Sequence, residues 1–94
     1  MKRYELNCHY VRRTAPSYVS EICASVKYYW SDMITEQQIE HELHCIKLHI
    51  EELHFRGHFL GQELKIDIKD RSLLVWNRTH SAIILTITFE PVND

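Results

Sequence analysis

The stretch TEQQIEHELHCIKLHIEELHFRG, residues 35–57, decides the fold of this 94-residue chain. Its apolar residues recur at spacings of four and three, which places them on one side of an α-helix. They are Ile39, Leu43, Ile46, Ile50 and Leu53. Thr35 and Gln38 match a capping box, and Gly57 can take the left-handed conformation that ends a helix. We therefore expect a helix whose apolar stripe packs against the rest of the domain.

The flanking segments predict a second helix and four strands. Residues 2–12 and 64–69 alternate between apolar and polar side chains, which is typical of half-buried strands. Residues 72–77 and 82–89 are rich in β-branched and other apolar residues and indicate two further strands. Residues 17–30 have helical periodicity instead. Because the connection to the long helix is short, formed by Ser31, Asp32 and Met33, the two helices should form an antiparallel hairpin.

The resulting order, β-α-α-β-β-β, predicts a single α+β domain over residues 1–94. Its expected architecture is a two-layer sandwich, with an antiparallel sheet and the helical hairpin on one face. The last strand should turn one set of side chains towards the helices, namely Ile83, Leu85, Ile87 and Phe89. The other face of the sheet would be left without a covering layer.

This open face is expected to carry an apolar group within a polar surround. The apolar residues are Leu74, Trp76 and Ile84, and the polar ones are Lys65, Lys69, Thr86 and Thr88. An apolar group on an exposed face favours a contact with a protein partner or with a second copy of the chain. The alternative is that Trp76 only covers the aliphatic stems of the lysines.

Composition narrows the functional classes. The net charge of -2 provides no overall attraction to nucleic acid. With two glycines, the chain has no glycine-rich phosphate loop, and we expect no cofactor. The three cysteines show no CxxC spacing, so free thiols in a reducing cytoplasm are expected. The first residues show no signal peptide, and no apolar run is long enough to span a membrane.

Three clusters carry residue types that could do chemistry or bind a partner. His41, Cys45 and His49 are zinc-type ligands four residues apart, although three ligands on one straight helix rarely converge on one metal. A second cluster combines basic residues with Trp76 and could bind RNA, although acidic residues are interleaved with it. Its basic members are Lys65, Lys69, Arg71 and Arg78. Third, Tyr28, Tyr29 and Trp30 end the first helix and favour an interface, or else cover the end of the hairpin.

The chain also resembles the RelE/ParE toxin superfamily over residues 17–89. KYYWS at 27–31 is similar to the aromatic end of that family's first helix, and IEHELHCIKLHIEEL at 39–53 is similar to its second helix. LLVWNR at 73–78 and AIILTITF at 82–89 are similar to its last hairpin. The resemblance implies a strand, a helical hairpin and a three-stranded meander.

What the resemblance implies for function differs between branches of the family. Members that cleave ribosome-bound mRNA use Arg, Lys, His or Tyr on the last strands and at the C-terminus. In this chain the candidates are Arg71, Arg78 and His80, and the final FEPVND offers none. ParE-like members bind a protein target instead, and this branch suits the chain better.

From these observations we expect a small non-enzymatic protein-binding module, toxin-like, that inhibits a protein target. The contact residues would be Leu74, Trp76, Tyr28, Tyr29 and Trp30. One alternative is a ribosome-dependent mRNA endoribonuclease. Another is an inhibitor or immunity-type protein that neutralises a partner enzyme, because a near-neutral chain without catalytic groups fits that role equally well.

Overall fold

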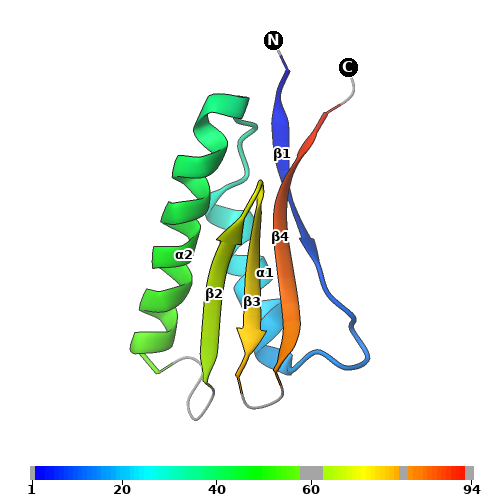
Figure 1. Ribbon diagram of the computed structural model, residues 1–94, viewed down its shortest axis with the longest axis vertical. Coiled ribbons are helices and arrows are strands. Elements are labelled where there is room, and N and C mark those ends of the chain that lie inside the picture. Colours follow the sequence, from blue (N-terminus) through cyan, green and yellow to red (C-terminus); the bar gives the residue numbers. More distant parts are fainter. Residues whose placement is uncertain (1, 58–62, 79–80, 93–94) are drawn as a thin grey trace.

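The computed structural model describes residues 2–57, 63–78 and 81–92. Its elements follow the predicted order (Figure 1). They are β1 Tyr4–His9, α1 Ser17–Tyr29, the 3₁₀ turn η1 Glu36–Gln38, α2 Ile39–Phe55, β2 Leu64–Lys69, β3 Ser72–Asn77 and β4 Ala82–Pro91. The four strands form one sheet in the order β1-β4-β3-β2, and all neighbours are antiparallel. The predicted α+β fold is confirmed.

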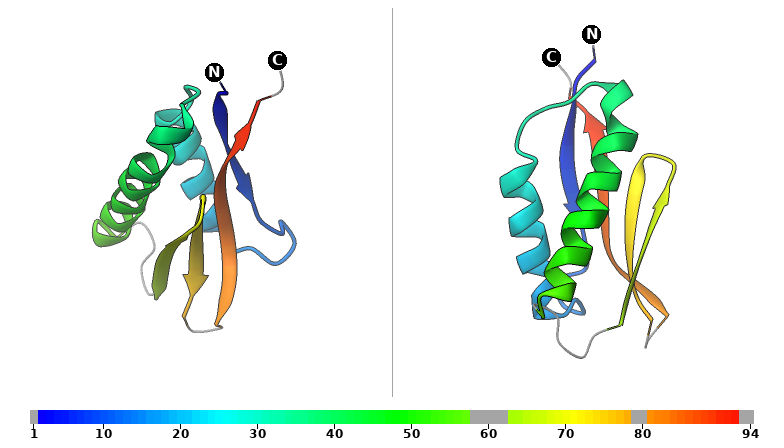
Figure 2. Two further views of the ribbon diagram at one scale, coloured as in Figure 1. Left: turned by 45° about the horizontal axis from the view of Figure 1, so that its top comes forward. Right: turned by 90° about the vertical axis from the view of Figure 1, so that its left-hand side faces the viewer.

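Both helices lie on the same face of this sheet and run in opposite directions (Figure 2). Each helix packs its apolar stripe against the sheet, because this packing removes the apolar side chains from water. The buried helical residues are Val19, Ile22, Cys23, Val26, Ile39, Leu43, Ile46 and Ile50. They meet the buried strand residues Tyr4, Leu73, Val75, Leu85, Ile87 and Phe89. The domain therefore has one core, between the helices and the sheet.

The start of the long helix differs from the sequence-based expectation. Residues 36–38 form a 3₁₀ turn, and the α-helix begins only at Ile39. The capping box is nevertheless present: the Thr35 backbone N–H donates to Gln38 Oε1 over 2.9 Å. A tighter first turn is common where a helix begins, because it pairs backbone groups that have no partner in the α-helix. At the other end Gly57 has φ 88°, which confirms its predicted left-handed conformation.

The predicted orientation of the first residues of the last strand is wrong, because the β3–β4 pair contains a bulge. Val75 lies opposite Leu85, but Trp76 lies opposite Ile83, so Ile84 is the extra residue. Beyond the bulge the alternation is shifted by one position. Ile83, expected in the core, is therefore 48% exposed beside Trp76, whereas Ile84 packs against the core. The sequence could not reveal this, because 82–85 is an unbroken apolar run in which either register buries an isoleucine.

The ends of the outer strands also differ from expectation. β1 is shorter than the predicted 2–12, and residues 10–16 form a loop that leads to α1. β4 continues through Pro91, which lies opposite Tyr4. Pairing continues past the proline because the backbone N–H of Val92 donates to the carbonyl oxygen of Arg3 over 2.9 Å. β4 therefore ends two residues later than the predicted 82–89.

The packing of α2 gives a matched pair of substitutions. Leu43 is fully buried, whereas Leu48 on the same helix is 67% exposed. We expect Leu43→Ala to lower the free energy of unfolding by about 2–5 kcal/mol, because it leaves a cavity in the core. Leu48→Ala should stay within about 0.5 kcal/mol of the original chain. Urea unfolding followed by circular dichroism measures both, and equal losses would contradict the assigned helix face.

Candidate protein-binding face

The open face of the sheet is the side that the helices leave uncovered (Figure 2). Side chains alternate along each strand, and residues paired across strands share a face. The register therefore places on the open face Glu5, Asn7, His9, Lys65, Asp67, Lys69, Ser72, Leu74, Trp76, Ile83, Thr86, Thr88 and Glu90. Three of these residues are large and apolar, and they lie on the two central strands.

The apolar centre of the open face consists of Leu74, Trp76 and Ile83. Trp76 lies opposite Ile83 on one side and opposite Lys65 on the other. The indole Nε1 of Trp76 is hidden from solvent and has no hydrogen-bond partner among the described residues. Leu74 and Trp76 lie on this face as predicted from the sequence. The third apolar residue is Ile83, and the prediction of Ile84 at this place is wrong. The centre thus offers apolar surface, and beneath it lies an indole N–H that other atoms of the chain cover.

Charges of opposite sign lie at the two edges of the open face. Lys65 and Lys69 lie on the outer strand β2, where Lys65 Nζ is 3.5 Å from Asp67 Oδ2. Glu5 and Glu90 face each other at the other edge. His9 Nε2 lies 2.7 Å from Glu90 Oε1, and this hydrogen bond, helped by one from Thr88, lowers the pKa of Glu90. The face therefore runs from a basic edge to an acidic edge.

The other predicted contact residues lie on a different surface. Tyr28 and Tyr29 are 76% and 66% exposed at the end of α1, on the helical side of the domain. Trp30 is partly buried there, and its Nε1 donates to Glu42 Oε2 on α2 over 2.6 Å. The two predicted groups of contact residues therefore lie on opposite faces of the domain, and no flat partner surface can contact both.

The zinc-type set on α2 does not converge on one point. Cys45 Sγ lies 3.6 Å from His41 Nε2, but His49 turns towards α1. There its Nε2 is 2.7 Å from Ser25 Oγ, and its ring packs edge-on against the rings of Tyr29 and Trp30. No group of three metal-type ligands occurs among the residues that the structure describes. His49 instead joins the two helices.

The candidate nuclease residues are not brought together. Arg71 and Arg78 lie at opposite ends of β3, roughly 23 Å apart along an extended strand. Arg71 forms an ion pair with Glu36, and its guanidinium lies 5.7 Å from the centre of the Tyr4 ring. His80 lies outside the described residues. The two arginines therefore cannot stabilise one phosphate together.

Comparisons with known proteins leave the family open. A scan against protein-family models found no match, and searches of curated proteins and of solved structures found none either. The resemblance to the RelE/ParE superfamily therefore stays a prediction. Among the described residues, no helix combines the length and the apolar character needed to cross a bilayer.

The environment of His49 predicts a pH effect on stability. Burial lowers its pKa from the usual 6.5, and the nearby Glu52 carboxylate only partly opposes this. As the pH falls below that value, the unfolded chain takes up a proton at this position before the folded chain does. The free energy of unfolding should therefore fall as the pH falls from about 7 to 5.

The His49→Gln variant should lose that part of the pH dependence, because its side chain does not titrate. His44→Gln, at an exposed position of the same helix, serves as the control and should behave like the original chain. Urea unfolding at several pH values measures the slope. Equal slopes for His49→Gln and the original chain would contradict the assignment.

Proposed function

We propose that this chain is a protein-binding module that acts through the open face of its sheet. The observation that carries the proposal is the apolar centre of Leu74, Trp76 and Ile83, which covers an indole N–H that has no acceptor among the described residues. Tryptophan is enriched among the residues that dominate binding energy at protein interfaces. Here the supporting feature is its position, at the middle of a face and between two charged edges.

The cost of an unpaired buried N–H favours a partner that provides a hydrogen-bond acceptor for the Trp76 indole. A buried donor without a hydrogen bond costs about 1–3 kcal/mol. Because atoms of the chain itself cover Trp76 Nε1, a backbone carbonyl or a side-chain oxygen of the partner would remove this cost once the side chains over the indole move aside. Ile83 would be removed from water in the same step. The expected partner surface therefore combines an apolar centre with a hydrogen-bond acceptor.

The charged edges specify the rest of the partner surface. It should present acidic groups to Lys65 and Lys69 and basic groups to Glu5 and Glu90. A toxin-like chain would use this face to inhibit its target, and an immunity-type chain would use it to neutralise an enzyme. Growth arrest on expression favours the first role, and harmless expression favours the second.

A second copy of the chain is the rival occupant. A two-fold axis parallel to the strands would place the acidic edge of one sheet over the basic edge of the other. However, three strands of six residues and one of ten span only about 450 Å², roughly half of what one partner buries in a standard interface. A different protein can extend beyond the sheet, and we therefore favour a heterologous partner.

The binding proposal is tested by affinity capture from the host lysate with matched variants. Ile83→Lys changes the centre of the open face, and Leu48→Lys makes the same change at an exposed position of α2. One stoichiometric partner that is retained by Leu48→Lys and lost by Ile83→Lys is the expected result. A partner retained by both variants would contradict the assignment of this face.

The oligomeric state distinguishes the two occupants. Sedimentation of the purified chain at increasing concentration should show a monomer. A dimer that dissociates in the Ile83→Lys variant would overturn the heterologous partner in favour of a second copy.

The endoribonuclease alternative has its own test. Because Arg71 and Arg78 lie at opposite ends of β3, we expect no cleavage of mRNA on programmed ribosomes by the intact chain. Gel analysis of the labelled mRNA is the measurement. Cleavage that the Arg78→Ala variant abolishes would contradict the non-enzymatic proposal.

A further inference from the structure

One edge of the sheet is incomplete where β1 leaves β4. β1 pairs only with residues 86–91 of β4, from His9 opposite Thr86 to Tyr4 opposite Pro91. Among the described strands, β3 alone pairs with residues 82–85. Figure 1 shows β1 turning away from the lower half of β4 before the chain returns to α1. About 13 Å of β4 is therefore left with a free edge, at roughly 3.3 Å per residue.

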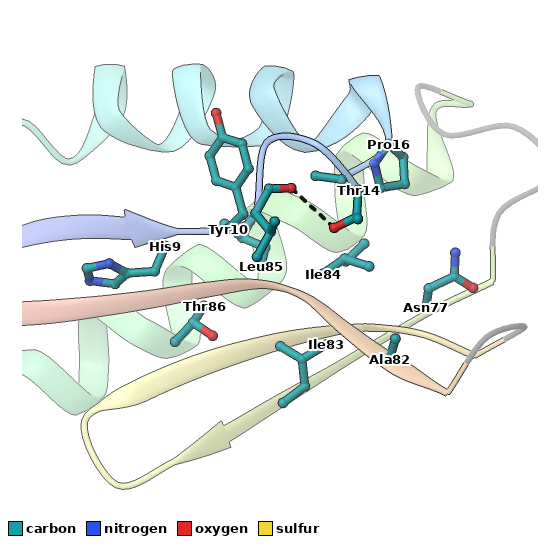
Figure 3. A pocket seen from close by; sticks show the side chains of 12 residues that line it. His9, Tyr10, Thr14, Pro16, Asn77, Ala82, Ile83, Ile84, Leu85 and Thr86 are labelled. Atoms are coloured by element: carbon teal, nitrogen blue, oxygen red, sulfur yellow. Dashed lines mark hydrogen bonds between the residues drawn. The ribbon is translucent and has the colours of Figure 1, made fainter.

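A cavity of about 560 Å³ occupies this position. Figure 3 shows the end of β1 and the loop 10–16 on one side of it and the start of β4 on the other. Its lining is mainly apolar, through Val11, Ala15, Pro16, Ala82, Ile83, Ile84 and Leu85. We call this cavity, together with the free edge of residues 82–85, the edge notch. Its volume lies within the range of ligand pockets, about 300–1,000 Å³.

The backbone at the edge notch lacks hydrogen-bond partners on its outer side. In the part of the chain that the structure describes, no backbone hydrogen bond outside the helices and strands involves residues 82–85. In an antiparallel sheet, alternate residues point their N–H and C=O groups towards the neighbouring strand. Part of the backbone of 82–85 therefore points into the notch ready to pair.

The loop that forms the other wall carries two arginines beside the notch. Arg12 and Arg13 are exposed on this loop but do not belong to the lining of the notch, and neither forms an ion pair with another described residue. Among the described residues, no acidic side chain lines the notch. An occupant with negative charge beside its apolar part is therefore favoured electrostatically.

We propose that the edge notch binds an extended peptide segment of a partner protein, which adds to the sheet as a strand beside residues 82–85. Its side chains would alternate, with apolar ones towards Ile84 and Leu85, and an acidic residue would follow near Arg12 and Arg13. Strand addition combines affinity from main-chain hydrogen bonds with specificity from pockets for alternate side chains. The inference rests on the proposed protein-binding function and names a second contact for it.

An extended peptide can contact more features of the edge notch than a small molecule or a second copy of the chain can. A small apolar molecule would fill the cavity but leave the free backbone groups of 82–85 unpaired. A second copy of the chain could pair edge to edge, but its own notch would bring the same basic loop against Arg12 and Arg13. An acidic extended peptide satisfies the backbone, the apolar lining and the loop charges together.

The experiment is a selection of random ten-residue peptides displayed on phage against the immobilised full chain. We expect enriched peptides that alternate apolar residues and carry an acidic residue at one end. A synthetic copy of the enriched peptide should bind in a fluorescence anisotropy titration. A copy methylated at alternate backbone nitrogens on its sheet-facing side should bind about tenfold more weakly or worse, because it cannot donate to the edge. Failure of the selection would overturn the proposal.

Variants then locate the bound peptide. Thr14 is exposed and lines the notch, so Thr14→Trp should obstruct it and weaken binding about tenfold or more. Ser31→Trp, at an exposed position in another connection, should bind like the original chain. Arg12→Glu with Arg13→Glu should also weaken binding, and the effect should shrink at high salt.

Leu74→Lys separates this proposal from the binding of a partner to the open face. Leu74 belongs to the open face but does not line the notch, so peptide binding should be unchanged in this variant. Binding lost in Leu74→Lys and kept in Thr14→Trp would overturn the edge notch while leaving the open-face proposal standing. Amide hydrogen exchange gives an independent reading: bound peptide should slow exchange within residues 82–85, and unchanged exchange there would overturn the proposal.

Discussion

The packing of the α2 stripe against the sheet is the interaction on which the rest of the structure depends. The buried side chains of α2 are removed from water because they pack on the inner side chains of β3 and β4. These helical residues are Ile39, Leu43, Ile46 and Ile50. With the helical hairpin on that face, no described segment covers the other face of the sheet. The exposed position of the Leu74, Trp76 and Ile83 group is thus a consequence of how the core forms. The same constraint holds Tyr28 and Tyr29 on the opposite side of the domain.

Sequence periodicity predicted the elements well because each carries a clear local pattern. The alternation in 64–69 and the capping residues Thr35 and Gly57 are recognisable without tertiary information. Alternation could not predict the bulge, because residues 82–85 are all apolar and only pairing with β3 decides which of them faces inward. That one shift in register explains why Ile83, and not the predicted Ile84, lies on the open face.

The candidate sites were predicted less well than the fold because they depend on distances across elements. Arg71 and Arg78 are close in sequence, but a straight six-residue strand holds them apart. His49 shares a helix with His41 and Cys45, yet its ring turns towards Ser25 on α1. The edge notch has no sequence signal of its own, since it results from β4 beginning four residues before Thr86, where its pairing with β1 starts. In each case the missing information was the relative position of two elements.

Ile83 connects the two binding proposals. It lies on the open face opposite Trp76, and it also lines the edge notch. A partner could therefore place a folded surface over Trp76 and continue with an extended segment along β4. Such an arrangement would enlarge the interface beyond the limited area of the sheet face, which by itself is small for a stable complex.

The two tryptophan indoles provide the most direct test of the central claim that the open face binds the partner. Trp30 Nε1 already donates to Glu42 on the helical side, whereas Trp76 Nε1 has no partner among the described residues. The measurement is the ¹⁵N–¹H spectrum of the labelled chain as the captured partner is added. We expect the Trp76 indole signal to shift and to exchange more slowly with solvent, while the Trp30 signal stays in place. A shift of Trp30 with an unchanged Trp76 would place the partner on the helical side and contradict the account.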